Sequence, residues 1–121
     1  MNKQYKVYKG LEFIRKTEQG EIDIERSKDI VKEIAIAASA HSVSDIILDL
    51  RDTETVLNFG DLLEVTMEFK EYPEAINGKI AVIIPKEDRR IKNVEFMKTS
   101  MMVKGLTMDY FFTYEDAIDW F

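Results

Sequence analysis

Three charged residues follow one apolar run closely enough to form a polar site. Asp49, Arg51 and Asp52 lie at the end of residues 45–50, which the pattern predicts to be a buried parallel strand. Ligand sites in open α/β sheets favour the carboxyl ends of strands. Two carboxylates there could bind a divalent cation or act as general acid and general base. The plainer interpretation is that Arg51 forms an ion pair with an aspartate and that the other charges are solvated.

The sequence lacks the residue types that most nucleophilic and metal-dependent sites use. It contains no cysteine, and His41 is the single histidine. A serine-histidine-aspartate triad would have to use His41, and no second histidine or thiolate is present to share a zinc ion with it. His41 follows a predicted helix, where such a side chain interacts favourably with the helix dipole. We therefore predict no catalytic residues, no metal site and no cofactor.

A basic cluster stands where the third predicted helix begins. Its members are Lys86, Arg89, Arg90 and Lys92. Free N–H groups at a helix N-terminus bind anions, and basic side chains would strengthen that binding. No glycine-rich phosphate loop accompanies the cluster, however, and two acidic residues lie within it. A solvated helix face of mixed charge is the simpler interpretation.

The helix expected over about residues 88–104 is apolar on more than one side. Met97 and Met101 fall on the stripe that would face a core, whereas Phe96 and Met102 fall outside it. Methionine is common at surfaces that accept varied partners. Trp120 also lies off the inward stripe of the last predicted helix. We predict that these five residues contribute to a surface for self-association or a protein partner, or to the wall of an apolar ligand site.

Composition describes one ordinary globular domain. The chain has 121 residues, of which 45% are hydrophobic and 33% charged, enough to bury a core without disulfides. It shows no repeat or linker, so we expect a single domain over residues 1–121. No signal peptide is evident, and no apolar run approaches the ~20 residues of a membrane span; we expect a cytoplasmic protein. The formal charge of −6 disfavours nucleic acid, because phosphate binding depends on lysine and arginine.

Alternating strand and helix patterns predict the elements that would position these residues. Strands are expected at about residues 5–8, 11–17, 45–50, 79–84 and 108–112, with Gly20 closing the second strand segment. Helices are expected at about residues 24–40, 58–70, 88–104 and 114–121. The expected N-caps are Asp23, Asn58 and Thr113. The order ββαβαβαβα predicts an α/β fold with a single mixed, mostly parallel sheet of about five strands and about four helices.

In the second helix, five residues are expected along one face. These are Phe59, Leu62, Leu63, Thr66 and Phe69.

Three segments carry a resemblance to a known family. Residues 45–52 read Asp-Ile-Ile-Leu-Asp-Leu-Arg-Asp, residues 79–85 form a hydrophobic strand ending in proline, and residues 110–121 end in Glu-Asp-Ala-Ile-Asp-Trp-Phe. These segments resemble the STAS-like domain family, specifically its bacterial SpoIIAA-like branch. The resemblance implies a STAS-like fold and a role in protein interaction, as in sigma-factor partner switching. The grouping of this branch with CRAL-TRIO lipid-transfer domains implies, alternatively, a small apolar or lipid-like ligand.

The chain departs from that family at the residue that a kinase would modify. In the anti-sigma factor antagonists, a serine in an Asp-Ser-Ser-Gly-like turn opens the second helix. The corresponding residues 57–62 have Gly60 in place, but Phe59 stands where the serine would be. Phenylalanine cannot accept a phosphate, so we predict a non-catalytic interaction module without this phosphorylation switch. A further alternative is an enzyme that uses Asp49, Arg51 or Asp52.

Overall fold

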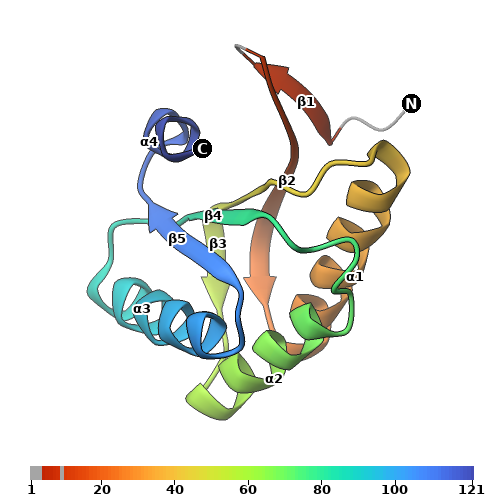
Figure 1. Ribbon diagram of the computed structural model, residues 1–121. Coiled ribbons are helices and arrows are strands. Elements are labelled where there is room, and N and C mark those ends of the chain that lie inside the picture. Colours follow the sequence, from red (N-terminus) through yellow and green to blue (C-terminus); the bar gives the residue numbers. More distant parts are fainter. Residues whose placement is uncertain (1–3, 9) are drawn as a thin grey trace.

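In residues 4–8 and 10–121, which the computed structural model describes, the chain forms a mixed sheet of five strands. The strands are β1 (Tyr5–Tyr8), β2 (Leu11–Ile22), β3 (Ile46–Thr55), β4 (Lys79–Ile83) and β5 (Thr107–Phe111). They lie in sequence order across the sheet, with β1 antiparallel to β2 and the others parallel (Figure 1). The predicted fold class is confirmed.

The helices divide between the two faces of this sheet. The first three are α1 (Ile24–His41), α2 (Phe59–Lys70) and α3 (Asp88–Val103). Each connects two neighbouring parallel strands, and crossovers of one hand place their helices on one face. The last helix, α4 (Tyr114–Trp120), follows β5 and packs on the opposite face (Figure 1). One face is therefore covered by three helices and the other by one short helix.

The predicted N-caps fix where three of the helices begin. The Asp23 side chain accepts a hydrogen bond from the backbone N–H of Arg26 at 2.9 Å. The Asn58 side chain and the Asp61 carboxylate exchange hydrogen bonds with each other's backbone N–H groups, which makes a capping box. The Thr113 hydroxyl accepts from the N–H three residues later. Each bond satisfies a backbone donor that the first turn of a helix would otherwise leave unpaired.

The expected end of the second strand at Gly20 is wrong. β2 runs on to Ile22, and β3 runs on to Thr55, so that Gly20 pairs with Thr53 beyond the end of β4. Gly20 has a positive φ of 84°, which glycine adopts without steric cost inside an extended segment. Polar residues dominate these ends, so hydrophobic alternation did not indicate them. The two strands form an extension that projects past the rest of the sheet.

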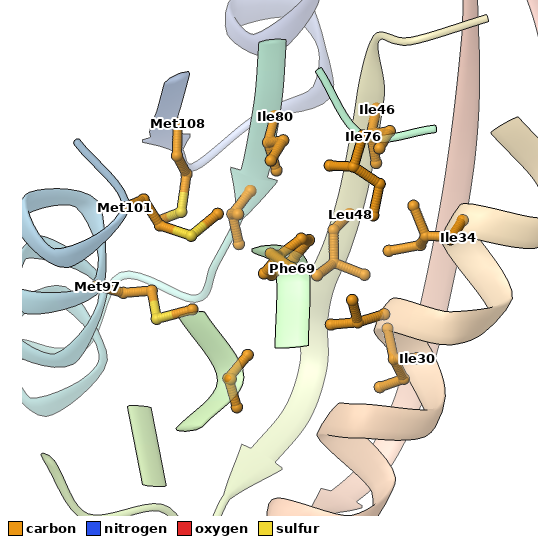
Figure 2. Close-up of a cluster of buried hydrophobic side chains, with 14 of the residues drawn as sticks. Ile30, Ile34, Ile46, Leu48, Phe69, Ile76, Ile80, Met97, Met101 and Met108 are labelled. Carbon is orange, nitrogen blue, oxygen red and sulfur yellow. The ribbon is translucent and has the colours of Figure 1, made fainter. Parts of the chain in front are cut away.

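The larger core lies between the sheet and α1–α3. Figure 2 shows Ile30 of α1, Leu48 of β3 and Met97 of α3 directed toward the centrally placed Phe69 of α2. Each such side chain contributes about 1.5–3 kcal/mol when it leaves water. A smaller cluster on the opposite face packs Phe13 and the neighbouring strands against α4. The three-helix face is therefore the one deep enough to contain an internal site.

Candidate functional site

The predicted polar site at the end of β3 is an ion pair. Asp49 is buried and accepts hydrogen bonds from Arg51 through Nε at 3.0 Å, Nη2 at 2.7 Å and the backbone N–H at 3.2 Å. Nη2 of Arg15 lies 3.5 Å from Asp49 Oδ2, and its guanidinium lies over the Tyr114 ring. This is the pairing that the plainer interpretation of the sequence anticipated. Asp52 is exposed, and its carboxylate forms no hydrogen bond or ion pair with the described residues.

These contacts decide the charge of Asp49. Burial alone would raise the pKa of its carboxyl, but the hydrogen bonds from Arg51 and Arg15 outweigh burial and hold that pKa below its ordinary value. The carboxylate is therefore ionised at neutral pH, with both oxygens engaged.

The structure also locates the other candidate ligands of a metal ion. No group of three or more histidine, aspartate or glutamate side chains that could hold a metal occurs among the residues that the structure describes. His41 lies in the last turn of α1, and its ring stacks on the Tyr5 ring at a centroid distance of 4.6 Å.

The apolar residues predicted on α3 take different positions. Met97 and Met101 are buried in the larger core (Figure 2), whereas Met102 is 67% exposed. Phe96 is half-buried, and its ring packs against the ring of Phe59 on α2 at a centroid distance of 4.6 Å. Of the two residues outside the core stripe, Phe96 therefore contacts α2, and Met102 is exposed to solvent.

Trp120 does not join that surface. It lies on α4, on the opposite face of the sheet, where it packs against Phe111 and Phe121. The expectation that Trp120 and α3 share one surface is wrong, because the helix that follows the last strand crosses to the uncovered face.

Phe59 also belongs to an exposed apolar stripe along α2. Phe59, Leu63 and Met67 are 45%, 50% and 49% exposed and stand at positions i, i+4 and i+8, on one side of the helix. We call these three residues the α2 stripe. The sequence placed Phe59 and Leu63 on one face with Leu62 and Phe69, but only the latter two are buried.

A cavity of about 110 Å³, partly open to solvent, lies between the sheet and the three helices. Its wall comes from α1, α2, α3 and the sheet and is mainly apolar. It includes Ile22 and Thr55 at the carboxyl ends of β2 and β3, and Ile84 just after β4. Met97 is the one residue of the predicted apolar site that lines it. A cavity of about 150 Å³ can hold benzene, so this one has room for about four carbon atoms.

Arg90 brings a positive charge to this cavity. It is only 4% exposed and lines the cavity wall. Its Nη1 donates to the backbone carbonyl of Thr53 at 2.6 Å, and its Nη2 donates to the Thr53 hydroxyl at 3.0 Å. Burial lowers the pKa of Arg90 below its ordinary value, yet arginine stays protonated in proteins. None of the ion pairs among the described residues involves it.

The solvated helix face expected for the basic cluster is therefore wrong for Arg90. Arg90, Val94, Met97 and Met101 stand at positions i, i+4, i+7 and i+11, which is the buried side of α3. The spacing to Val94 and Met97 is a signal in the sequence that could have indicated burial of this arginine.

Comparisons with known proteins agree with this architecture. No known protein family and no curated protein sequence matches the chain. The structure is similar to that of an uncharacterised protein of the DUF3478 family, with a SpoIIAA-like fold, from Shewanella loihica PV-4. That match has a TM-score of 0.61 and 12% identity, and covers 96% of this chain and 88% of the other. The chain therefore has the SpoIIAA-like α/β fold that the sequence resemblance implied.

Two further structures match less well. The anti-sigma factor antagonist SpoIIAA in its unphosphorylated form gives a TM-score of 0.48 and 23% identity over 97% of this chain and 94% of that one. The phosphorylated form of the Bacillus cell fate determinant SpoIIAA gives a TM-score of 0.43 and 19% identity over 96% of this chain and 97% of that one.

None of the helices in the described residues is long and apolar enough to cross a membrane.

Proposed function

We propose that this chain is a non-catalytic binding protein that holds a small apolar molecule between the sheet and α1–α3. The observation that supports this proposal is the cavity of about 110 Å³ with its mainly apolar wall. Protein interiors are close-packed, with few voids larger than a water molecule. An apolar wall offers a water molecule few hydrogen-bond partners, so an apolar guest is the favoured occupant.

A binding role is supported over catalysis by the state of the polar residues near β3. A general acid or base needs a carboxyl or imidazole group that can exchange a proton with a substrate. Asp49 instead has both oxygens engaged by arginine side chains. His41 is stacked on Tyr5. Asp49 and His41, the residues best suited to catalysis by their chemistry, are thus engaged by neighbouring side chains.

Isobutanol, a neutral molecule with four carbon atoms, tests the cavity. We expect it to raise the melting temperature of the wild-type protein and to shift the methyl NMR signals of Met97 and Val94, which line the cavity. Val94→Phe should fill the space and abolish both effects, while changing the free energy of unfolding by less than about 1 kcal/mol, since the void accepts the added volume.

The matched control adds a comparable volume where the protein is packed. Ala81 is fully buried in the smaller cluster against α4, and Ala81→Val should cost about 1–3 kcal/mol through overpacking. Failure of isobutanol to affect the wild-type protein, or an equal loss of stability in both variants, would contradict the proposal.

A second candidate function rests on the α2 stripe. Its three residues are about half exposed and continue into Phe96 on α3, and adjacent exposed apolar residues indicate an interaction surface. We propose that this surface binds a second copy of the chain. Light scattering over a range of concentrations should then detect a dimer that Leu63→Lys converts to a monomer. Ile36→Lys, a change at a still more exposed apolar residue of α1, should leave the dimer intact. A wild-type protein that is monomeric at every concentration would refute the proposed dimer.

A further inference from the structure

Arg90 is an unusual component of an apolar cavity. Its guanidinium is buried, and its two hydrogen bonds go to Thr53, a neutral residue. Neutral acceptors satisfy individual N–H groups but do not compensate a full positive charge in a medium of low polarity. Arginine does not lose its proton. Burial lowers the pKa of Arg90 by more than the nearby carboxylate of Glu87 raises it, so Glu87 compensates the positive charge only in part. Among the described residues no carboxylate forms an ion pair with it.

Asn93 adds a second polar group at the same place. It stands three residues after Arg90 on α3, which puts both on one side of the helix, and both line the cavity. Asn93 is half-buried, and its amide makes no hydrogen bond within the described residues. The cavity therefore has hydrogen-bond donors on the α3 side and is lined by aliphatic side chains such as Val31, Leu48 and Val65 elsewhere.

We propose that the cavity takes a small aliphatic carboxylic acid, with its carboxylate held by Arg90 and Asn93 and its alkyl tail among the apolar side chains. This inference rests on the proposed function, because it assigns the chemical class of the molecule in that same cavity. A guanidinium group and a carboxylate match in geometry and charge. One bound carboxylate neutralises one arginine, whereas a phosphate group would bring additional charge that this cavity does not compensate.

The volume limits the length of the acid. By comparison with the cavity of about 150 Å³ that holds benzene, a space of about 110 Å³ fits a tail of about four carbon atoms when the carboxylate lies at the open side of the cavity. A short, branched acid such as isovalerate has a suitable tail. Its neutral amide, isovaleramide, has nearly the same shape and lacks the charge, so the pair separates the contribution of the charge from that of the tail.

Isothermal titration of the purified protein at about pH 7, where a carboxylic acid is ionised, tests the inference. Isovalerate should bind at least about tenfold more tightly than isovaleramide, because hydrogen bonds to charged groups are stronger than neutral ones. Arg90→Gln should weaken isovalerate binding by about tenfold or more and leave isovaleramide binding within about threefold.

Asn93→Asp supplies a second test that does not remove the arginine. The new carboxylate lies one turn from Arg90 and would replace the charge of the ligand, so we expect a higher melting temperature and loss of the preference for isovalerate. This variant decides the question if Arg90→Gln does not fold. Should Asn93→Asp bind isovalerate as tightly as the wild type, or should the wild type bind both compounds equally, the carboxylate inference is overturned while the apolar cavity stands. If the wild type binds neither isovalerate, isovaleramide nor isobutanol, the proposed function falls as well.

Discussion

Arg90 of α3 donates hydrogen bonds to both the carbonyl oxygen and the hydroxyl oxygen of Thr53 in β3. Its Nη1 donates to the backbone carbonyl at 2.6 Å and its Nη2 to the hydroxyl at 3.0 Å. Thr53 pairs with Gly20 in the extension of β2 and β3 beyond β4, and Thr55 of the same extension lines the cavity. The arginine thus joins the start of α3 to the strand extension that borders the cavity.

Removal of the Thr53 hydroxyl should destabilise the protein. In Thr53→Val a buried guanidinium nitrogen loses its acceptor and the Leu50 carbonyl loses its donor; an unsatisfied polar group costs about 1–3 kcal/mol. Urea unfolding measures this loss, and Thr53→Ser should restore most of it. The matched control is Thr99→Val, because Thr99 is exposed and its hydroxyl bonds only within its own helix; we expect a change within about 0.5 kcal/mol. Equal effects of Thr53→Val and Thr99→Val would show that the Arg90–Thr53 contact does not stabilise the fold.

The ion pair of Asp49 and Arg51 predicts a dependence of stability on pH. Because the folded protein holds the pKa of Asp49 below its ordinary value of 3.8, the pair stabilises the fold above that value. This contribution is lost as the pH falls through the lowered pKa of the folded state. At about pH 7, Asp49→Asn should cost about 1.5–3 kcal/mol, the range for hydrogen bonds to a charged group.

Urea unfolding over a range of pH measures this difference. The gap in free energy of unfolding between wild type and Asp49→Asn should narrow as the pH falls below about 4, because the wild-type carboxyl also loses its charge there. Asp52→Asn is the matched control, since Asp52 is exposed, and its gap should stay small throughout. A gap for Asp49→Asn that does not change with pH would contradict the assigned role of the charge.

Much of the fold could be predicted because hydrophobic spacing reports burial. The core of β4 is almost entirely apolar, and α1 shows regular helical spacing, so their types and positions followed from the sequence. The long ends of β2 and β3 could not be predicted in this way. Residues such as Gly20 and Thr53 pair through their backbones. Backbone hydrogen bonds do not require an alternation of polar and apolar side chains, so the sequence shows no strand pattern there.

Less of the candidate site than of the fold could be predicted from the sequence. An ion pair between Arg51 and an aspartate could be predicted because such pairs are common among neighbouring charges. The structure identifies the partner as Asp49, which is two residues away on the same face of β3. The burial of Arg90 was not anticipated, because a charged residue within a basic cluster is normally solvated. The cavity depends on how four strands and three helices pack together, and no local pattern in the sequence encodes such a space.

Gly78 tests the packing of the chain just before β4. A Cβ atom added there would lie 2.5 Å from the backbone oxygen of Ser44 and 2.6 Å from a carboxylate oxygen of Asp45. That Asp45 oxygen also accepts the backbone N–H of Lys79 at 2.9 Å, so it is held in place. Gly78→Ala should therefore cost about 1–3 kcal/mol through overpacking, measured by urea unfolding. Asn77→Ala, at the exposed neighbouring residue, should change stability by less than about 0.5 kcal/mol; similar values for the two would refute this close approach.

The rings of Phe59 and Phe96 connect α2 to α3 at the protein surface. Their centroids lie 4.6 Å apart with an interplanar angle of 40°, and an aromatic pair of this kind contributes about 0.5–1.5 kcal/mol beyond area burial. A double-mutant cycle with Phe59→Ala and Phe96→Ala, followed by urea unfolding, should return a coupling energy in that range. As a control, Phe59→Ala should be additive with Val7→Ala within about 0.5 kcal/mol, because Val7 lies on β1, far from α2 (Figure 1). A coupling near zero for the aromatic pair would mean that the two rings are independent, and Phe96 would then have no part in extending the α2 stripe.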